Sequence, residues 1–284
     1  SRVLTRRFGV LNEAVRKMRE GSYSHRAEVG GSDEISELAL EFNAMADRLQ
    51  KTEEARRRFV SDASHELKTP LAGIRLLSDS ILQTEEMDMD TVREFVGDIE
   101  QESERLARIT ENLLRLTRLD SGALPAAEVV DIAPVIARVA RMLRLVAGER
   151  QVALSCEILR EGRTLASEDE LNEIIYNLTE NAIKYNRPGG FVHIALGGDD
   201  DRCALTVSDN GIGIPESDLP RIFDRFYRVD KARSRAAGGT GLGLSIVADT
   251  VQRRGGSIAA CAREGGGTVF TVYMPRCGEG GESA

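Results

Sequence analysis

The chain lacks tryptophan, has few aromatic residues and contains no long apolar run. Aromatic residues make up 5% of its 284 residues. No apolar run approaches the roughly 20 residues of a membrane-spanning helix, and no signal-peptide pattern is present. A net charge of −8 excludes general nucleic-acid binding through a basic surface. An apolar content of 41% still suffices for packed cores, and the length predicts about two or three domains.

Cysteine is also scarce, and its spacing excludes two kinds of site. The four cysteines are Cys156, Cys203, Cys261 and Cys277, with no CxxC pair and no cysteine–histidine cluster. A zinc site or a disulfide framework is therefore excluded, and a reducing compartment is indicated. The first three lie in apolar, strand-like segments, where we expect them to be small core residues.

Apolar residues recur at alternating spacings of four and three in two segments of the first 50 residues. They are Leu4, Phe8, Leu11, Val15 and Met18, then Ile35, Leu38, Phe42, Met45 and Leu49. This spacing is typical of coiled-coil helices. The connector 21–31 can return along a helix of roughly 24 Å, so the two helices can be parallel. Two such seams cannot close a core alone, which predicts a four-helix bundle from two chains. Ser32 is the expected N-cap of the second helix, ahead of Asp33 and Glu34.

A single histidine stands in the middle of the next helical segment. Ala63 and Leu67 share one helix face, and His65 lies between them, pointing away from that face toward water. Glu66 follows it directly. A lone histidine is more often structural, but an exposed imidazole beside a carboxylate favours a nucleophile.

The same segment ends in a proline and leads into a helical hairpin. Thr69 lies four residues after His65 and shares its face, and Pro70 is expected to bend the helix by removing a backbone donor. A polar break at 84–90 separates it from a second amphipathic helix, which is expected to end near residues 121–122. We expect an antiparallel hairpin that dimerises into a second four-helix bundle.

From about residue 128 the pattern changes to mixed helices and strands. Helices are predicted at 132–147, 169–186 and 242–254, and strands at 152–158, 191–196, 203–208, 257–261 and 268–274. This mixture predicts one α/β sandwich domain.

The second of these helices carries a pair of amides. Asn177 and Asn181 are one turn apart, and Lys184 or Tyr185 falls on the same face. Two amide oxygens with this spacing suit Mg²⁺, which takes oxygen ligands, water and substrate phosphates. A basic side chain nearby suits a phosphate group.

Two glycine-containing segments follow. Asp209 comes directly after a strand and can accept a hydrogen bond from an exocyclic amine such as that of adenine, while Gly211 and Gly213 allow close approach of a ligand. The run from Gly238 to Gly243 leads straight into a helix, whose first amides form an anion site. It is neither a Walker sequence nor a dinucleotide fingerprint. Any one of these segments alone is more often an ordinary loop.

In this order, with the segment Arg221–Arg228 between the last two, the motifs closely resemble the ATP-binding domain of sensor histidine kinases. That GHKL-type (Bergerat) fold is shared with the Hsp90, gyrase and MutL ATPases. Residues 33–49 resemble a HAMP domain, the relay that follows a transmembrane helix. The resemblance implies a parallel four-helix HAMP coiled coil at 1–51 and a dimerisation and histidine phosphotransfer hairpin at 52–123. It also implies an α/β ATP-binding domain at 124–277, and residues 278–284 are expected to be a disordered tail.

The resemblance also implies the ligands and the residues that hold them. ATP and Mg²⁺ are expected, with Asn181 as the main metal ligand, Asn177 near the same phosphates, Asp209 on adenine and Tyr185 beside the base. The rest of the expected nucleotide-binding set is Lys184, Gly211, Gly213, Lys231, Arg233, Gly239, Thr240, Gly241, Leu242 and Gly243. Residues 228–240 would form a mobile lid. Phe223 and Phe226 would be its latch or plain core residues, and Lys231 and Arg233 would touch phosphate or remain solvated.

In such a protein His65 would attack the γ-phosphate of ATP, with Glu66 as general base. The phosphoryl group would pass to an aspartate of a response-regulator receiver domain, and Thr69 would position water for the reverse phosphatase reaction. A homodimer is expected, as the cytoplasmic portion of a protein that is anchored in a membrane upstream of residue 1. Two alternatives remain: an ATPase of the gyrase and Hsp90 kind with water as acceptor, and a scaffold that binds ATP only to change shape.

Overall fold

The computed structural model describes residues 2–28, 30–31, 33–84, 86–120, 126–230 and 239–277. The chain divides into two compact units, Ser1–His65 and Glu66–Ala284. The expected N-cap Ser32, the expected helix end at 121–122 and the expected tail 278–284 lie outside the described residues.

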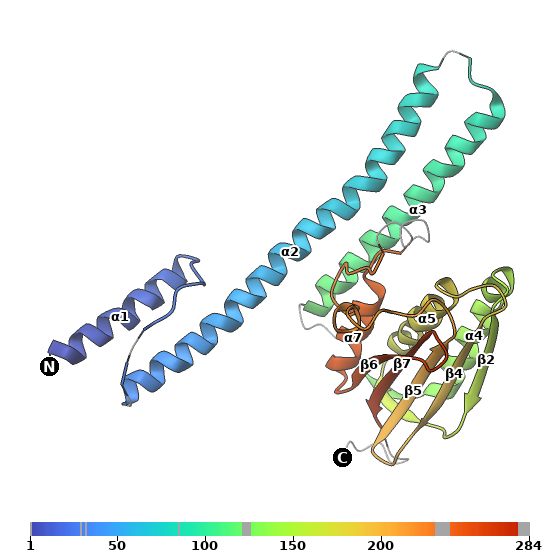
Figure 1. Cartoon of the computed structure of the whole chain (residues 1–284). Coiled ribbons are helices and arrows are strands. Elements are labelled where there is room, and N and C mark those ends of the chain that lie inside the picture. Colours follow the sequence, from blue (N-terminus) through green and yellow to red (C-terminus); the bar gives the residue numbers. More distant parts are fainter. Residues whose placement is uncertain are drawn as a thin grey trace. The chain divides into compact units, whose positions relative to one another are not determined.

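The first unit pairs helix α1 (Arg2–Arg19) with the first half of helix α2 (Glu34–Gln83). Near the start of both helices, Arg7 forms an ion pair with Asp33 and donates a 2.7 Å hydrogen bond to Ser36 Oγ. The starts of α1 and α2 therefore lie side by side, and the two helices are parallel, as expected (Figure 1). Asp33 takes the capping role, because its side chain accepts the backbone N–H of Ser36 at 3.2 Å. Hydrogen bonding from Arg7 holds the pKa of Asp33 well below its usual range.

The core of this unit is small and uses only part of the predicted seams. It consists of Leu11, Ala14, Ala27, Ala39, Phe42 and Ala46, with Met18 packed against it. Four seam residues remain about half exposed: Phe8, Val15, Leu38 and Met45. Alanines thus bring the two helices together beside Leu11 and Phe42, while these four seam side chains remain accessible.

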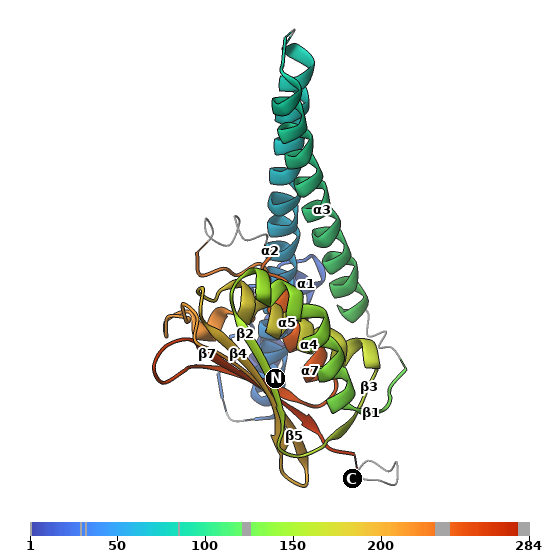
Figure 2. The ribbon, with the colours of Figure 1, turned by 90° about the vertical axis from the view of Figure 1, so that its right-hand side faces the viewer.

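In the second unit, the last part of α2 and helix α3 (Met89–Asp120) form the antiparallel hairpin (Figures 1 and 2). Helix α2 contains Pro70 and continues to Gln83, where the predicted polar break at 84–90 begins. Asp88 starts the return helix by accepting the backbone N–H of Thr91 at 2.8 Å.

The rest of the second unit is a two-layer α/β sandwich. Its elements are β1 (Glu128–Asp131), α4 (Ile132–Glu149), β2 (Ala153–Ile158), β3 (Arg163–Ala166), α5 (Glu168–Lys184), β4 (Phe191–Gly198), β5 (Arg202–Asp209), η1 (Leu219–Arg221), α7 (Gly243–Arg253), β6 (Ser257–Ala262) and β7 (Thr268–Pro275). The main sheet has the order β2-β4-β5-β7-β6, and β1 pairs with β3 in a separate ribbon. Only the β2–β4 pair of the main sheet is parallel.

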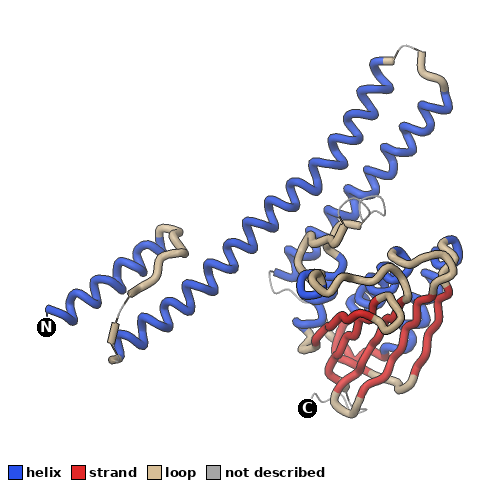
Figure 3. The backbone as a smooth tube through the Cα atoms, in the orientation of Figure 1, coloured by secondary structure: helices blue, strands red, loops and turns tan. Residues whose placement is uncertain are grey.

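Helices α4, α5 and α7 pack on one face of this sheet (Figures 2 and 3). Along β4 and β5, buried and partly exposed residues alternate, as expected when one face is covered. Between the layers lies the largest core, with Ile174, Leu178, Ile194 and Val207 fully buried. It holds α5, and thus the predicted amides, rigidly against the sheet.

The predicted helices and the five predicted strands of this domain are present, each end within two residues of the expected position. The short strands β1 and β3 were not predicted, because four residues are too few for a clear alternation. The prediction of three core cysteines is correct for Cys203 and wrong for Cys156 and Cys261, which are exposed. Both wrong cases lie on the edge strands β2 and β6, where neighbours cover only one side.

Candidate functional site

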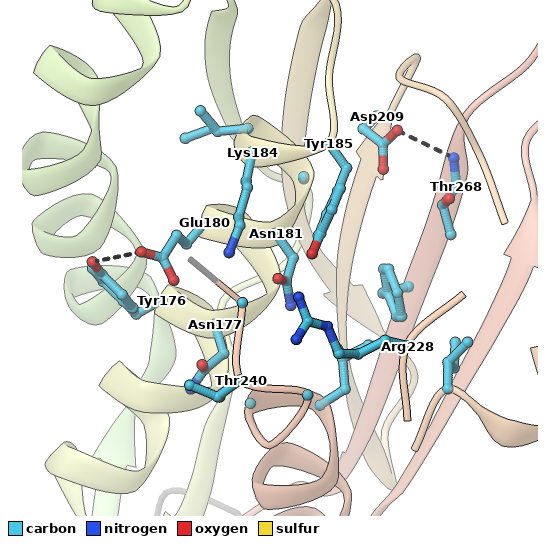
Figure 4. A pocket seen from close by; sticks show the side chains of 18 of the residues that line it. Tyr176, Asn177, Glu180, Asn181, Lys184, Tyr185, Asp209, Arg228, Thr240 and Thr268 are labelled. Atoms are coloured by element: carbon cyan, nitrogen blue, oxygen red, sulfur yellow. Dashed lines mark hydrogen bonds between the residues drawn. The ribbon is translucent and has the colours of Figure 1, made fainter. Parts of the chain in front are cut away.

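A cavity of about 970 Å³ lies in the second unit, within the range of small-molecule sites. Its wall is built from α5, the segment after β5, residues 227–230 and the glycines before α7, with part of α3 and α4 on the outer side. Figure 4 shows the side chains of Asn177, Asn181, Lys184, Tyr185 and Asp209 converging on it.

Helix α5 is fixed at its start by a reciprocal cap. Ser167 Oγ accepts the backbone N–H of Glu170 at 3.1 Å, and Glu170 accepts the backbone N–H of Ser167 at 2.7 Å. Glu170 also forms a buried ion pair at 2.8 Å with Arg254, the residue after α7. The cap and the ion pair therefore fix α5 against α7, the two helices that frame the cavity.

Asn177 and Asn181 both line the cavity, one turn apart. Asn177 donates through Nδ2 to the carbonyl of Glu173 at 3.0 Å, which directs its Oδ1 the other way. That oxygen faces the start of α7, because a Cβ built on Gly243 would lie only 2.6 Å from it. Two amide oxygens in a polar cavity fit Mg²⁺ that also keeps waters and phosphate ligands. In the described part of the chain, no cluster of three or more histidine, cysteine or acidic ligands offers a competing site.

Asp209 is buried at the floor of the cavity, at 6% exposure. Its Oδ1 accepts the backbone N–H of Gly211 at 2.8 Å and that of Thr268 at 3.3 Å. Both bonds use Oδ1, which leaves Oδ2 as the oxygen available to another donor. Burial raises the pKa of Asp209, and the two backbone donors oppose this rise.

The loop after Asp209 packs closely against the end of α5. The backbone N–H of Ile212 donates to the carbonyl of Tyr185 at 3.1 Å, and a Cβ on Gly211 would lie 2.5 Å from the same oxygen. Gly213 has φ +73°, in the left-handed region that glycine adopts readily. Tyr185 and Gly213 line the cavity, whereas Gly211 lies behind it and allows the close approach of the two segments.

Residues Gly239, Thr240, Gly241 and Gly243 line the cavity where α7 begins. Gly241 has φ +72°, and its carbonyl accepts the backbone N–H of Phe226 at 2.9 Å. The backbone amides at the start of α7 thus lie beside Asn177, in the arrangement of an anion site. Leu242 differs from the expectation for a lining residue, because its side chain is fully buried and does not line the cavity.

On helix α2, His65 and Thr69 are exposed, as expected from their common face, and Pro70 is buried. Glu66 is half-buried, and its Oε2 accepts a 3.3 Å hydrogen bond from Arg105 Nη2 on α3. Arg228 Nη1 reaches the same oxygen at 3.8 Å. His65 belongs to the first unit and Glu66 to the second.

Comparison with known proteins accounts for this combination of elements. Residues 1–51 match the HAMP domain, residues 55–122 match the His Kinase A (phospho-acceptor) domain, and residues 166–277 match the histidine kinase-, DNA gyrase B- and HSP90-like ATPase family. The three matches occur in one chain and in the order expected from the sequence. The chain belongs to the sensor histidine kinases.

Individual members of this family are similar over most of the chain. The sensor-like histidine kinase SenX3 of Mycolicibacterium smegmatis is 38% identical over 79% of the chain, and the signal transduction histidine-protein kinase BaeS of Escherichia coli is 32% identical over 93%. The chain covers 59% and 56% of those two proteins, so it spans little more than half their length. The crystal structure of full-length ShkA in complex with AMPPNP has 25% identity and a TM-score of 0.58, over 80% of this chain and 47% of that one. None of the described helices of this sensor histidine kinase is both long and apolar enough to cross a membrane.

The sequence predicted the position of some charged residues at the cavity but not of others. Lys184 lines the cavity, and burial lowers its pKa to about 8 against the opposing charge of Glu180. Arg228 also lines it, with its side chain only 4% exposed, although the sequence indicated it only as the start of a lid. The expected phosphate contacts Lys231 and Arg233 lie outside the described residues, as does most of that lid.

Three further observations complete the comparison with the expected site. Thr268 lines the cavity and bonds Asp209, and the three glycines that precede it are the signal that could have indicated it. Phe223 is partly buried against the domain core and packs edge-on against Phe270 at 6.4 Å between ring centroids, as expected for core packing. Phe226 has φ +62° and is tied through its backbone to Gly241.

Proposed function

We propose that this chain is an ATP-dependent histidine autokinase that phosphorylates His65 and passes the phosphoryl group to an aspartate of a response regulator. The observation that carries the proposal is the pairing, in one chain, of an exposed histidine on a phospho-acceptor-type helix with a cavity of GHKL type. Neither part alone distinguishes an autokinase from an ATPase.

The residues divide the work of phosphoryl transfer among them. The neutral imidazole of His65 attacks phosphorus, a P–N bond forms, and the bond to the leaving ADP breaks with its electron pair. Glu66 takes the proton that the ring loses and holds the ring in orientation. Asp209 binds the adenine amine through Oδ2, and Thr268 fixes that carboxylate.

The polar residues around the phosphates supply charge and orientation. Asn181 and Asn177 would hold Mg²⁺, which would supply positive charge to the phosphate oxygens. Lys184 and Arg228 add positive charge from the cavity wall, and the amides at the start of α7 bind phosphate oxygens.

We also propose a homodimer as the working form. Half-exposed seam residues in the first unit, Phe8, Val15, Leu38 and Met45, need a second copy to be covered. On the hairpin, Leu71, Leu76, Val96 and Leu114 are exposed in the same way. The HAMP match supports a position next to a membrane, where a signal reaches α2. The phosphatase role of Thr69 stays a prediction.

The test is incubation with ATP labelled at the γ-phosphate, followed by acid or base. The chain contains three histidines, His25, His65 and His193. We expect a protein label that is lost in acid and stable in base, absent from H65Q and retained in the matched controls H25Q and H193Q. H65Q should still bind the nucleotide.

The alternatives give other outcomes in the same experiment. An ATPase of the gyrase kind releases phosphate and leaves no label on the wild-type protein. A scaffold binds ATP, and neither label nor free phosphate appears. Acid-labile label that persists in H65Q would refute the assignment of the acceptor while leaving the kinase class intact.

A further inference from the structure

Arg105 occupies a position in α3 where a nonpolar residue is expected. It lies four residues before Ile109 and eleven before Leu116, so all three share one stripe of the helix. Ile109 and Leu116 are fully buried, and Arg105 is only 5% exposed. A charged side chain in an apolar stripe is costly, which marks it as a specific feature of the hairpin.

The guanidinium of Arg105 lies between carboxylates of both helices. Nη2 donates to Glu66 Oε2 at 3.3 Å, and Nη1 lies 3.6 Å from Glu102 Oε2. Glu102 is on α3 itself and lies next to Gly73 of α2, where an added Cβ would be 3.9 Å from Glu102 Cγ. Glu102 therefore packs against α2 at ordinary contact distance while its carboxylate forms an ion pair with the other end of the Arg105 guanidinium.

We propose that Arg105 is a positioning residue that holds the Glu66 carboxylate in place to accept the proton from His65. This inference rests on the proposed function. Glutamate on a helix surface samples several rotamers, whereas a general base must keep one position relative to the proton it takes. Arg105 donates to Oε2, which leaves Oε1 as the oxygen that can face the proton.

A second guanidinium reaches the same oxygen but cannot replace Arg105. Arg228 Nη1 is 3.8 Å from Oε2, beyond hydrogen-bond distance. It also belongs to the ATP-binding part and lines the cavity, where phosphate competes for it. Arg105 sits on the partner helix of the same hairpin, so its bond to Glu66 does not depend on the nucleotide.

The first measurement separates catalysis from binding. R105M removes the charge and keeps an apolar side chain in the stripe, and R105K keeps a charge that cannot span both carboxylates. We expect R105M to lower kcat for autophosphorylation at least about tenfold, with KM for ATP within about twofold of wild type. The kcat of R105K should lie between those of R105M and the wild type. The control R93M, on the same helix and paired only with exposed Asp90, should retain wild-type kcat.

The second measurement is a double-mutant cycle with E66Q. If Arg105 acts through Glu66, adding R105M to E66Q lowers the rate less than about twofold further. An equal drop in both backgrounds, or R105M with wild-type kcat, would overturn the proposal. Thermal unfolding of each variant shows whether a lower rate is caused by unfolding of the protein. If unfolding is the cause, R105M lowers the rate in the wild-type background and in the E66Q background alike. Absence of label in the wild-type protein would instead refute the proposed function.

Discussion

Gly243 offers a substitution whose effects on stability and on nucleotide binding should have opposite signs. It is the first residue of α7, and a Cβ at this position would lie 2.6 Å from Asn177 Oδ1. Contacts below 3.4 Å are rare for real Cβ atoms, so the separation must grow by 3.4 − 2.6 = 0.8 Å. The atom that moves is the end of a flexible side chain, so the amide shifts and the backbone stays.

The expected magnitudes follow from this displacement. Alanine at a compatible helical position stabilises a protein by up to about 1 kcal/mol relative to glycine, which offsets the small cost of moving the amide. A shift of nearly 1 Å in a positioning group can cost up to about a hundredfold in rate. We therefore expect G243A to melt at or above the wild-type temperature. Its Mg²⁺-dependent ATP affinity should fall at least about tenfold, equivalent to about 1.4 kcal/mol.

The assay is titration calorimetry with a nonhydrolysable ATP analogue, with and without Mg²⁺, beside a thermal melt. G148A is the matched control, because Gly148 is also helical, in α4, and an added Cβ meets nothing within 4 Å. It should match or exceed wild-type stability and bind nucleotide like the wild type. Unchanged Mg²⁺ dependence in G243A would refute the assignment of Asn177 to the metal and phosphate site.

Two further predictions concern buried carboxylates. D209N keeps the shape of the side chain but lets an amide group face the base, so calorimetry should show at least about tenfold weaker ATP binding and a smaller preference over GTP; unchanged preference would contradict the role of Asp209. Burial raises the pKa of Glu173 to about 7, against the attraction of Arg115. The folded state therefore holds this proton more tightly, and stability is lost as pH rises from about 4.5 to about 7, by up to about 3 kcal/mol. E173Q should remove this loss in urea unfolding curves at pH 5 and pH 8, and a pH dependence parallel to wild type would disprove it.

Local patterns predicted the elements of the ATP-binding domain well, because each long element is amphipathic. Helix α5 carries its apolar stripe through Leu171, Ile174 and Leu178, and its boundaries follow from the Ser167 cap and the residues after Lys184. The asparagines fall on the other face by the same periodicity, so their common position in the cavity could be predicted. Roles of individual residues, by contrast, follow from the family resemblance and remain to be tested.

Contacts between distant segments could not be predicted in this way. Thr268 donates its backbone N–H to Asp209 across 59 positions, and no property of threonine indicates this. The tight turn before it does carry a signal, since Gly267 has φ +98° and an added Cβ would lie 2.0 Å from the Asp209 carbonyl. Three consecutive glycines before a strand are thus more than a flexible loop, because at Gly267 only glycine fits against the backbone of Asp209.

The sequence could have indicated one half of the contact between Glu66 and Arg105. The two residues are 39 positions apart, so their contact is invisible to any local pattern. The exception that Arg105 makes to its stripe is nevertheless visible in the sequence, since it shares the face of Ile109 and Leu116. A buried charge persists in such a stripe only if it is paired, and here carboxylates come from Glu102 of the same helix and from Glu66 of the antiparallel helix. In this hairpin the paired glutamate directly follows His65, the proposed phosphoryl acceptor, so a movement of α2 relative to α3 would alter the contact between Glu66 and Arg105.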